Sequence, residues 1–344
     1  MKKIIMVGPD SKGKGGISTV IHNFIHSFKQ EEWQVSYVCS WKASAKLLYS
    51  LRAWCQLFFL THTQQIEIVH IHVSQDASFY RKAILLTAIK KNAKVIFHMH
   101  APQFDLFYQR KSTRGQNRIE KIFNRVDLVV ALSEEWAQFY QQLTTTKVQV
   151  IENAVNVPEV FHYQVHSKNV LTFGRICERK GSQDIVTLAK RIEKKLPDLR
   201  FSLYGDTDET TVKIIQQIKD LDCRNVELHG WTDQQEELLK DCALHLLPSY
   251  HEGVPMAILE TMANGVPNLA TEVGGINQVV KHQINGYLVS PGSIDEMEHY
   301  LLAFFSDPEM RCRFSNQARM MIDEHFSIPN YLQSWNRVYQ SLTK

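Results

Sequence analysis

The segment LHLLPSYHEGVPMAILETMANGVPNLAT, residues 244–271, has the pattern of one strand–helix–strand unit. Short apolar runs at Leu244–Leu247 and Asn268–Thr271 predict buried strands. The residues between them predict a helix that begins at Pro255, because the first helical position tolerates a residue without an amide hydrogen. Strand, covering helix and second strand together form the repeating unit of a parallel α/β sheet.

Two glutamates in this unit, Glu252 and Glu260, are eight positions apart. Glu252 precedes the helix, whose N-terminal amide groups and dipole attract anions. Glu260 lies about 7–8 Å along the helix axis from Pro255. Carboxylates in these places could hold hydroxyl groups at the two ends of a nucleotide sugar, with its diphosphate between them. The competing interpretation is that both are ordinary solvated glutamates of a helix.

The same alternation continues along the chain, whose 344 residues are enough for two domains. We expect an α/β protein with two Rossmann-like, doubly wound domains that face a cleft and bind ligands at the carboxyl ends of the strands. We expect an N-terminal domain at 1–155, a linker at 156–168 and a C-terminal domain at 169–328. The predicted strands are Ile4–Val7, Val35–Cys39, Ile66–His72, Val95–His100, Leu128–Leu132, Val148–Ile151, Val170–Phe173, Phe201–Tyr204, Val226–His229, Leu244–Leu247, Asn268–Thr271 and Tyr287–Val289.

Composition restricts the class of protein. Hydrophobic residues make up 44% of the chain and charged residues 22%, which is typical of a globular protein. The six cysteines include no C-x2-C pair, so we expect reduced thiols rather than disulfides or a zinc site. The apolar run Ile4–Val7 is too short for a signal peptide, and no uncharged apolar stretch is long enough to span a membrane. These features predict a cytoplasmic protein.

Positive charge is concentrated in the N-terminal part of the chain. Residues 1–150 hold 20 Lys and Arg against 10 Asp and Glu, whereas residues 151–344 hold 19 against 26. We expect this half to face an anionic membrane surface or a phosphorylated substrate, and no nucleic acid, because stacking aromatic residues are not interleaved with the basic ones. The apolar helical segment 45–60, with Tyr49, Trp54, Phe58 and Phe59, suits a membrane interface. The alternative is a helix packed on the N-terminal sheet.

Two glycine-containing loops follow predicted strands and could approach phosphate. The first, GPDSKGKGGIS, lacks the Ser or Thr of a P-loop and the spacing of a dinucleotide fingerprint, which leaves Gly15 and Gly16 at a helix start. The alternative for this pair is a simple tight turn. The second, GRICERKG, contains Arg175 and Lys180, and two cations just before a helix suggest a bound anion such as a diphosphate.

Metal binding is not expected. His98 and His100 end a predicted strand and point to the same side, but no third ligand is evident nearby. Asp206 and Asp208 resemble a D-x-D metal motif, yet their place after a strand favours a turn and helix-cap role. We therefore expect no metal ion and no cofactor, with a nucleotide diphosphate sugar as co-substrate.

Taken together, these residues resemble the retaining GT-B glycosyltransferases of the glycogen synthase and mannosyltransferase-like group, which comprises glycosyltransferase family 4 and glycosyl transferases group 1. The resemblance covers nearly the whole chain and is most specific over Phe173–Pro291. Its motifs are G-R with K-G, S-x-x-E-G with a second glutamate, G-x-P, G-G and N-G-x-L-V-x-P-G. They occur at Gly174-Arg175, Lys180-Gly181, Ser249, Glu252-Gly253, Glu260, Gly265, Pro267, Gly274-Gly275 and Asn285–Gly292.

The resemblance implies roles for these residues. Arg175 and Lys180 would bind the donor diphosphate and stabilise the leaving group in place of a metal. Glu260 would bind the ribose hydroxyls, Glu252 the sugar hydroxyls, and His100 would lie near the reacting face of the sugar. A helix at 329–344 would cross back to the first domain. The expected donor-binding residues are Gly15, Gly16, Arg175, Lys180, Glu252, Gly253, Val254, Pro255, Met256 and Glu260, and the expected catalytic residues are His100, Arg175, Lys180 and Glu252.

The resemblance also implies the reaction: metal-independent transfer, with retention, from a nucleotide diphosphate sugar, expected to be a UDP-sugar, to a glycan acceptor. We expect a lipid-linked acceptor at the inner face of a bacterial membrane. A sugar-nucleotide 2-epimerase on the same fold and a non-catalytic scaffold of a polysaccharide assembly complex remain alternatives. The chain departs from the family after Gly274-Gly275, where Asn277 and Gln278 replace the usual Pro and Glu, and in the linker, which reads IENAVN instead of I-P-N-G-V-D.

Overall fold

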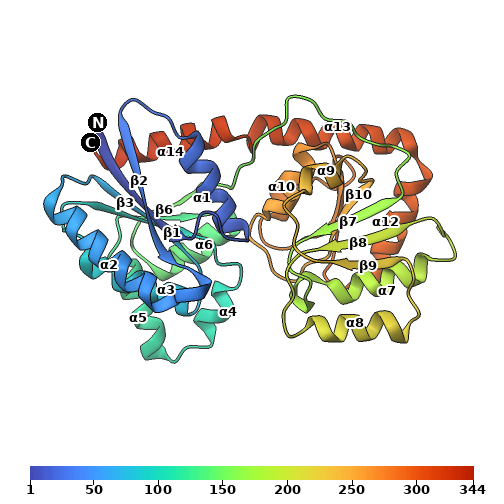
Figure 1. Cartoon of the computed structure of the whole chain (residues 1–344), viewed down its shortest axis with the longest axis horizontal. Coiled ribbons are helices and arrows are strands. Elements are labelled where there is room, and N and C mark those ends of the chain that lie inside the picture. Colours follow the sequence, from blue (N-terminus) through green and yellow to red (C-terminus); the bar gives the residue numbers. More distant parts are fainter. The chain divides into compact units, whose positions relative to one another are not determined.

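The computed structural model describes residues 1–344, except for the side chain of Ala43, and divides into two compact units. The N-terminal unit comprises Met1–Ala154 and Ile328–Lys344, and the C-terminal unit comprises Val155–Ser327. Each unit contains a parallel sheet of six strands between helices (Figure 1). This arrangement confirms the predicted α/β class.

The sheet of the N-terminal unit has the order β2-β1-β3-β4-β5-β6. Its strands are β1 (Lys2–Pro9), β2 (Trp33–Trp41), β3 (Ile68–Val73), β4 (Lys94–Met99), β5 (Leu128–Ala131) and β6 (Val148–Val150). Its helices are α1 (Gly16–Ser27), η1 (Ala43–Ala45), α2 (Lys46–Thr63), α3 (Ala77–Leu85), η2 (Leu86–Ala88), α4 (Phe104–Gln109), α5 (Thr113–Phe123), α6 (Glu134–Leu143) and α14 (Ile328–Leu342).

Side-chain alternation along β3 decides what covers each face of this sheet. Val69, Ile71 and Val73 point into the core that the sheet forms with α2 to α6. His70 and His72 point to the opposite face, where the centroid of the His70 ring lies 4.3 Å from the ring centroid of Trp335 of α14. The terminal helix α14 therefore completes the hydrophobic packing of the N-terminal unit.

The sheet of the C-terminal unit has the order β12-β11-β10-β7-β8-β9. Its strands are β7 (Asn169–Phe173), β8 (Arg200–Tyr204), β9 (Val226–His229), β10 (Leu244–Leu247), β11 (Asn268–Thr271) and β12 (Gly286–Val289). Its helices are η3 (Glu178–Lys180), α7 (Ser182–Ile192), α8 (Thr211–Asp220), α9 (Gln235–Leu239), α10 (Met256–Ala263), α11 (Ile276–Val279), α12 (Ile294–Ser306) and α13 (Pro308–His325).

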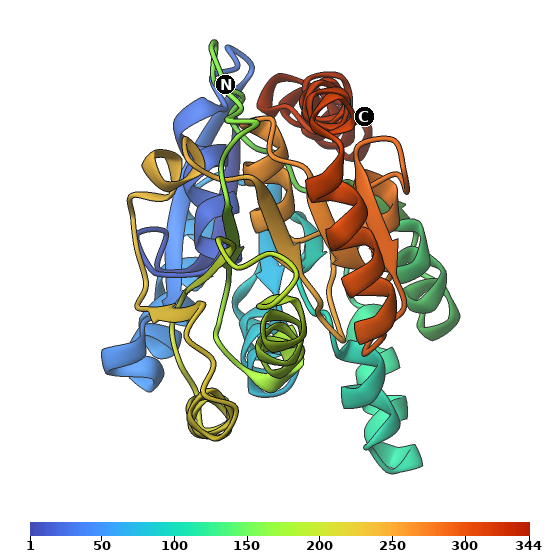
Figure 2. The same ribbon diagram turned by 90° about the vertical axis from the view of Figure 1, so that its right-hand side faces the viewer.

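Helices cover both faces of this second sheet. On one face α7 packs between α8 and α12 (Figures 1 and 2), and their apolar side chains form the main core of the unit. On the other face Leu239 of α9 and Val266 pack against Leu171 and Phe173 of β7. Residues 156–168, which we predict as a linker, also lie against this unit, since the Tyr163 hydroxyl donates to the carbonyl of Ala243 at 2.8 Å.

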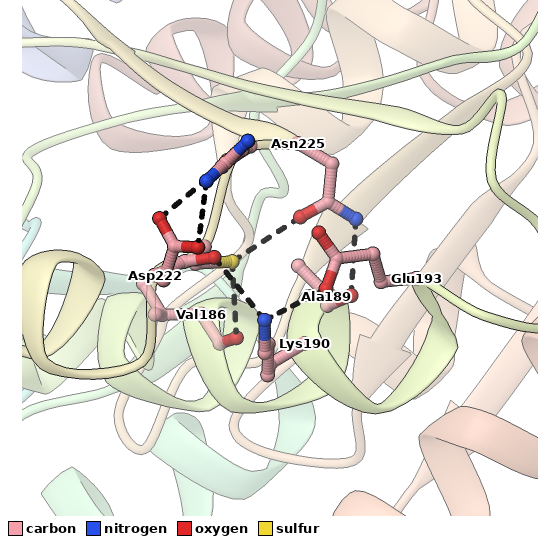
Figure 3. Close-up of polar contacts among 8 residues, drawn as sticks. Val186, Ala189, Lys190, Glu193, Asp222 and Asn225 are labelled. Carbon is pink, nitrogen blue, oxygen red and sulfur yellow. Dashed lines mark hydrogen bonds and ion pairs between the residues drawn. The ribbon is translucent and has the colours of Figure 1, made fainter.

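Figure 3 shows how the loop before β9 is tied to α7. Asn225 Nδ2 donates to the carbonyl of Ala189 at 3.0 Å, and Lys190 Nζ donates to the carbonyl of Asp222 at 3.1 Å. These bonds satisfy polar groups at the edge of the sheet, where an unpaired buried group would cost stability. They fix α7 relative to the edge of the sheet, and the loops at the opposite end of the strands extend from this sheet.

One predicted helix start differs from the one observed. Pro255 is not the first helical residue: it has an extended conformation, with φ −70° and ψ 128°, and is the N-cap of α10. In the part of the chain that the structure describes, none of the helices has the length and apolar content needed to cross a membrane.

Candidate nucleotide-sugar site

A buried ion pair lies at the carboxyl ends of β7 and β10, which are neighbours in the sheet. Lys180, from the loop after β7, donates from Nζ to Oε1 of Glu252, from the loop after β10. Arg179 adds a second cation, with Nη1 3.8 Å from the same oxygen. Glu252 is only 7% exposed. The structure thus joins two of the predicted site residues in one charge cluster.

Opposing effects act on the pKa of Glu252. Burial is the largest single effect and raises it, because a carboxylate loses its hydration, but the attraction of Lys180 and Arg179 together with hydrogen bonds to the carboxylate leaves the pKa below its usual value. Glu252 is therefore an ionised acceptor of hydrogen bonds at neutral pH. Removing one partner of such a pair leaves an uncompensated buried charge.

Two glycines let the loops of this cluster approach each other closely. Gly181 has φ 69°, and a Cβ atom there would lie 2.0 Å from the carbonyl oxygen of Pro248. Gly274 has φ 56°, and a Cβ atom there would lie 2.1 Å from the carbonyl oxygen of Glu252. Both positions combine a left-handed backbone with a backbone contact, so only glycine fits.

The N-terminus of α10 lies directly after the ion pair in the sequence. Its N-cap is Pro255, whose side chain offers no acceptor for the amide groups of the first turn. The side chains of Val254 and Met256 are buried, at 2% and 8% exposure. Of the predicted donor-binding stretch 253–256, Val254 and Met256 could therefore contact a ligand mainly through their backbone, as the N-terminus of a helix does with anions.

Glu260 lies further along α10 and is partly buried. Burial raises its pKa, and the nearby side-chain amide of Gln235 in α9 opposes that rise. Its surroundings differ from those of Glu252, because a neutral amide rather than a pair of cations lies beside it. The two glutamates of the sequence motif are therefore unlike in charge environment, which suits two different tasks.

Two residues of the cluster, Arg179 and His245, are not among the predicted ones. Arg179 also donates from Nη1 to the carbonyl of His251 at 2.7 Å and so bridges the two loops. His245 Nε2 accepts the amide hydrogen of Phe173 at 3.3 Å, which leaves Nδ1 to donate to Asn268 Oδ1. Burial lowers the pKa of His245 to about 4, so it is neutral. The signal for Arg179 in the sequence was its place in the loop between Arg175 and Lys180.

Arg175 is separate from the ion pair. Its side chain is exposed, at the end of β7. The nearby Asp208 forms a turn, as we expect, because its Oδ1 accepts the amide hydrogen of Thr210 at 2.9 Å. Arg175 is thus accessible to an anion from solvent, although the nearby Asp208 carboxylate also attracts it.

Three predicted residues, Gly15, Gly16 and His100, belong to the N-terminal unit. Gly15 is the N-cap of α1, has φ 110° and is exposed together with Gly16, so the amide groups at this helix start face solvent. His100 follows β4 and is 7% exposed, and its amide hydrogen is bonded to the carbonyl of Val73 at 2.7 Å.

His100 belongs to a buried cluster of four histidines. His72 Nδ1 lies 2.9 Å from His100 Nε2, and His70 Nε2 lies 3.1 Å from His98 Nδ1. His70 Nδ1 reaches the hydroxyl of Tyr339 at 2.8 Å. Burial lowers the pKa of His70 and of His100 to about 3, so both rings are neutral.

The premise that no third ligand lies near His98 and His100 is wrong, because β3 lies beside β4 and supplies two more imidazoles. That the protein binds no metal stays a prediction. One ring nitrogen from each of His70, His72 and His98 lies within 4.8 Å of those of the other two. The sequence signal was the second H-x-H pattern in IVHIHV, which the alternation along β3 places on the same face.

Comparisons with known proteins agree with this architecture. The Glycosyltransferase Family 4 model matches residues 14–158 and the Glycosyl transferases group 1 model matches residues 161–321. A poly(ribitol-phosphate) alpha-N-acetylglucosaminyltransferase of Staphylococcus aureus is 26% identical over 63% of this chain and 45% of its own length. A UDP-Gal:alpha-D-GlcNAc-diphosphoundecaprenol alpha-1,3-galactosyltransferase of Escherichia coli is 25% identical over 82% of this chain and 77% of its own length.

The fold agrees with solved structures over the whole chain. Anabaena HepE in complex with UDP-glucose superposes with a TM-score of 0.79, at 17% identity, over 99% of this chain and 100% of its own. The chain spans 61%, 45% and 26% of the lengths of the first three curated relatives that it matches. The two family matches follow one another along the sequence and fall on the two units. The chain belongs to the GT-B glycosyltransferases of the family 4 and group 1 type.

Proposed function

We propose that this protein transfers a sugar from a nucleotide diphosphate sugar, and specifically a UDP-sugar, to a glycan acceptor. The observation that carries the proposal is the buried Lys180–Glu252 pair at the N-terminus of α10, with Glu260 further along the same helix. Relatives whose names or bound ligands include UDP-sugars support this choice of donor.

The arrangement assigns different tasks to the charged groups. Arg175 and Lys180 bind the diphosphate, and Arg179 keeps Glu252 charged if Lys180 turns toward phosphate. Glu260 accepts hydrogen bonds from the ribose hydroxyls, and Glu252 accepts them from the sugar. The cations also stabilise the negative charge that develops on the leaving nucleotide, which is a task that does not require a metal.

We further propose that transfer retains the anomeric configuration. Glu252 is paired with Lys180, so it binds hydroxyl groups of the sugar rather than acting as the nucleophile of a two-step mechanism. The acceptor hydroxyl oxygen bonds to the anomeric carbon on the face from which the bond to phosphate breaks. The proton of that hydroxyl passes to the departing phosphate. The resemblance to the family implies a hydrogen-bonding role in this reaction for His100, whose ring is neutral because burial lowers its pKa to about 3.

The acceptor in this proposal is lipid-linked and is used at the inner face of a bacterial membrane in polysaccharide or glycoconjugate synthesis. A relative named for a diphosphoundecaprenol substrate supports the lipid link, and one named for poly(ribitol-phosphate) supports a surface polymer. Incubation with donor alone distinguishes a 2-epimerase, which would convert the donor without any acceptor.

A nucleotide-sugar panel, measured by thermal shift, tests the proposal. One UDP-sugar should raise the melting temperature of the wild type, because a ligand that binds only the folded state stabilises it. The shift should be smaller for Glu252→Ala and unchanged for Glu309→Gln, which alters an exposed glutamate of α13. A wild type that no nucleotide sugar stabilises at millimolar concentration would favour a non-catalytic scaffold.

A further inference from the structure

Helix α2 exposes an unusual amount of apolar surface. Leu47, Leu48, Leu51 and Phe59 are between 63% and 83% exposed, and Phe58 is 45% exposed. Ile84 of α3, which packs beside α2, adds a further exposed apolar side chain. Exposed apolar residues are common when scattered, but a contiguous group marks an interaction surface.

The geometry of the helix gathers these side chains on one face. At 3.6 residues per turn, Leu47, Phe58, Leu51, Leu48 and Phe59 fall within an arc of about 120°. The opposite side of α2 carries Ala53, Leu57 and Thr61, which are buried against the N-terminal sheet. One side of the helix packs on the sheet, as one alternative for segment 45–60 expects, and the other side faces outward, so contact with a membrane stays a prediction.

The structure corrects which aromatic residues lie outward. Trp54 is not on the outward face: its Nε1 donates to Thr87 Oγ1 at 2.9 Å, and it packs against the core. Tyr49 is half-buried. Leucines of the first two turns take their place, so the outward face is aliphatic at its N-terminal end and aromatic at its C-terminal end.

The charged residues of the two chain segments that contain α2 and α3 have one sign. Acidic residues are absent from the sequence between Glu32 and Glu67, and again between Asp76 and Asp105. The first interval contains all of α2 and the second contains all of α3. The exposed basic residues of these two intervals are Lys42, Lys46, Arg52, Lys90, Lys91 and Lys94.

Two of these lysines, Lys42 and Lys94, pair with Asp10 and Asp127, which lie outside the two intervals. Lys90 lies near the C-terminal end of α2, since its amide nitrogen donates a hydrogen bond to Thr61 Oγ1 at 3.3 Å. Lys46 is at the N-terminal end and Arg52 is in the middle. Basic groups therefore accompany the apolar face along its whole length.

We propose that the outward face of α2, together with Ile84, docks on the surface of an anionic lipid bilayer. Apolar side chains would enter the acyl boundary while lysine and arginine meet the phosphate of the head groups, as in helices that lie in the interface plane. A second copy of the chain fits less well, because a symmetric contact would bring the same basic groups together. The inference depends on the proposed function in one respect only, namely that the acceptor is linked to a lipid.

Flotation of the full chain with vesicles tests this docking without donor or acceptor. The wild type should bind vesicles with about 30% phosphatidylglycerol at least about 10-fold better than phosphatidylcholine alone, and salt should weaken the binding. Leu51→Ser/Phe58→Ser/Phe59→Ser should lose binding by at least about 10-fold, because each side chain loses apolar area that the bilayer would bury. Lys46→Glu/Arg52→Glu should also lose the preference for anionic vesicles.

The matched control is Val212→Ser/Ile215→Ser, which removes exposed apolar side chains from α8 of the C-terminal unit. This control should float as the wild type does. Equal binding to both kinds of vesicle, or full binding by the triple α2 variant, would overturn the proposal. A wild-type dimer in sedimentation that the triple variant abolishes would instead identify a second copy as the occupant. Circular dichroism and UDP-induced thermal shifts, measured on each variant, separate these results from misfolding or from a failure of the proposed function.

Discussion

Lys180→Met should destabilise the C-terminal unit, because it leaves the Glu252 carboxylate buried without its nearest cation. The side chains of Lys180 and Glu252 are 12% and 7% exposed, so solvent screens the pair little. Breaking a buried pair costs about 3–5 kcal/mol, and we expect about 3 kcal/mol because Arg179 remains 3.8 Å from the carboxylate. For a unit of this size that corresponds to a fall of about 6–12 °C in melting temperature.

The pH dependence of this loss has a defined sign. In the wild type the pKa of Glu252 is lowered, so its stabilisation is present above the pKa of an unfolded glutamate and is lost as pH falls through the lower folded pKa. In Lys180→Met burial dominates and should raise the folded pKa above the unfolded one. The folded variant then binds more protons than the unfolded chain, so its deficit should shrink as pH falls from about 7.5 to about 5.5.

Differential scanning calorimetry at the two pH values measures both effects. Lys240→Met is the control, since Lys240 pairs with Glu237 on the surface of the same unit and the change should cost less than about 1 kcal/mol. The double variant Lys180→Met/Glu252→Gln should recover part of the loss. A Lys180→Met protein that melts within about 2 °C of the wild type, with no change between the two pH values, would refute the reasoning.

Three further results are expected. Gly181→Ala should lower the free energy of unfolding of the C-terminal unit by about 2 kcal/mol or more, and with it the denaturant midpoint, because φ 69° and a 2.0 Å contact with Pro248 exclude a Cβ atom. Equal denaturant midpoints of wild type and variant would count against the close loop contact. UDP affinity, measured by titration calorimetry, should weaken as pH falls through the raised pKa of Glu260, because the ribose needs the carboxylate, and Glu260→Gln should show a flat profile. The imidazole NMR signals of His70 and His100 should not titrate between pH 8 and pH 5, since burial lowers both pKa values to about 3; a midpoint near pH 6 would show that these rings are solvated.

The fold could be predicted largely from the sequence because both sheets are parallel and buried. Runs such as Leu244–Leu247 and Asn268–Thr271 are rich in apolar residues and buried on both faces, and each is bounded by loop residues, so strand positions are well marked. Helix ends were less certain. The helix predicted to begin at Pro255 begins one residue later, because Pro255 has the conformation of an N-cap. The sequence alone does not distinguish a proline at the N-cap from a proline at the first helical position.

The candidate site was predicted only in part, because its contacts depend on strand order. Lys180 and Glu252 are 72 positions apart and meet because β10 lies beside β7, whereas the sequence shows only that each follows a strand. The histidines of β3 and β4 meet for the same reason. Arg179 pairs with Glu252 through the turn that Gly181 allows, and such local geometry is not encoded in a motif.

Titration calorimetry of UDP on wild type and Glu260→Gln tests the central claim most directly. The account predicts that the wild type binds UDP and that Glu260→Gln binds at least about 10-fold more weakly, because a neutral amide accepts weaker hydrogen bonds from the ribose than a carboxylate does. Equal UDP affinity of the two proteins, with both correctly folded, would contradict the placement of the nucleotide on α10.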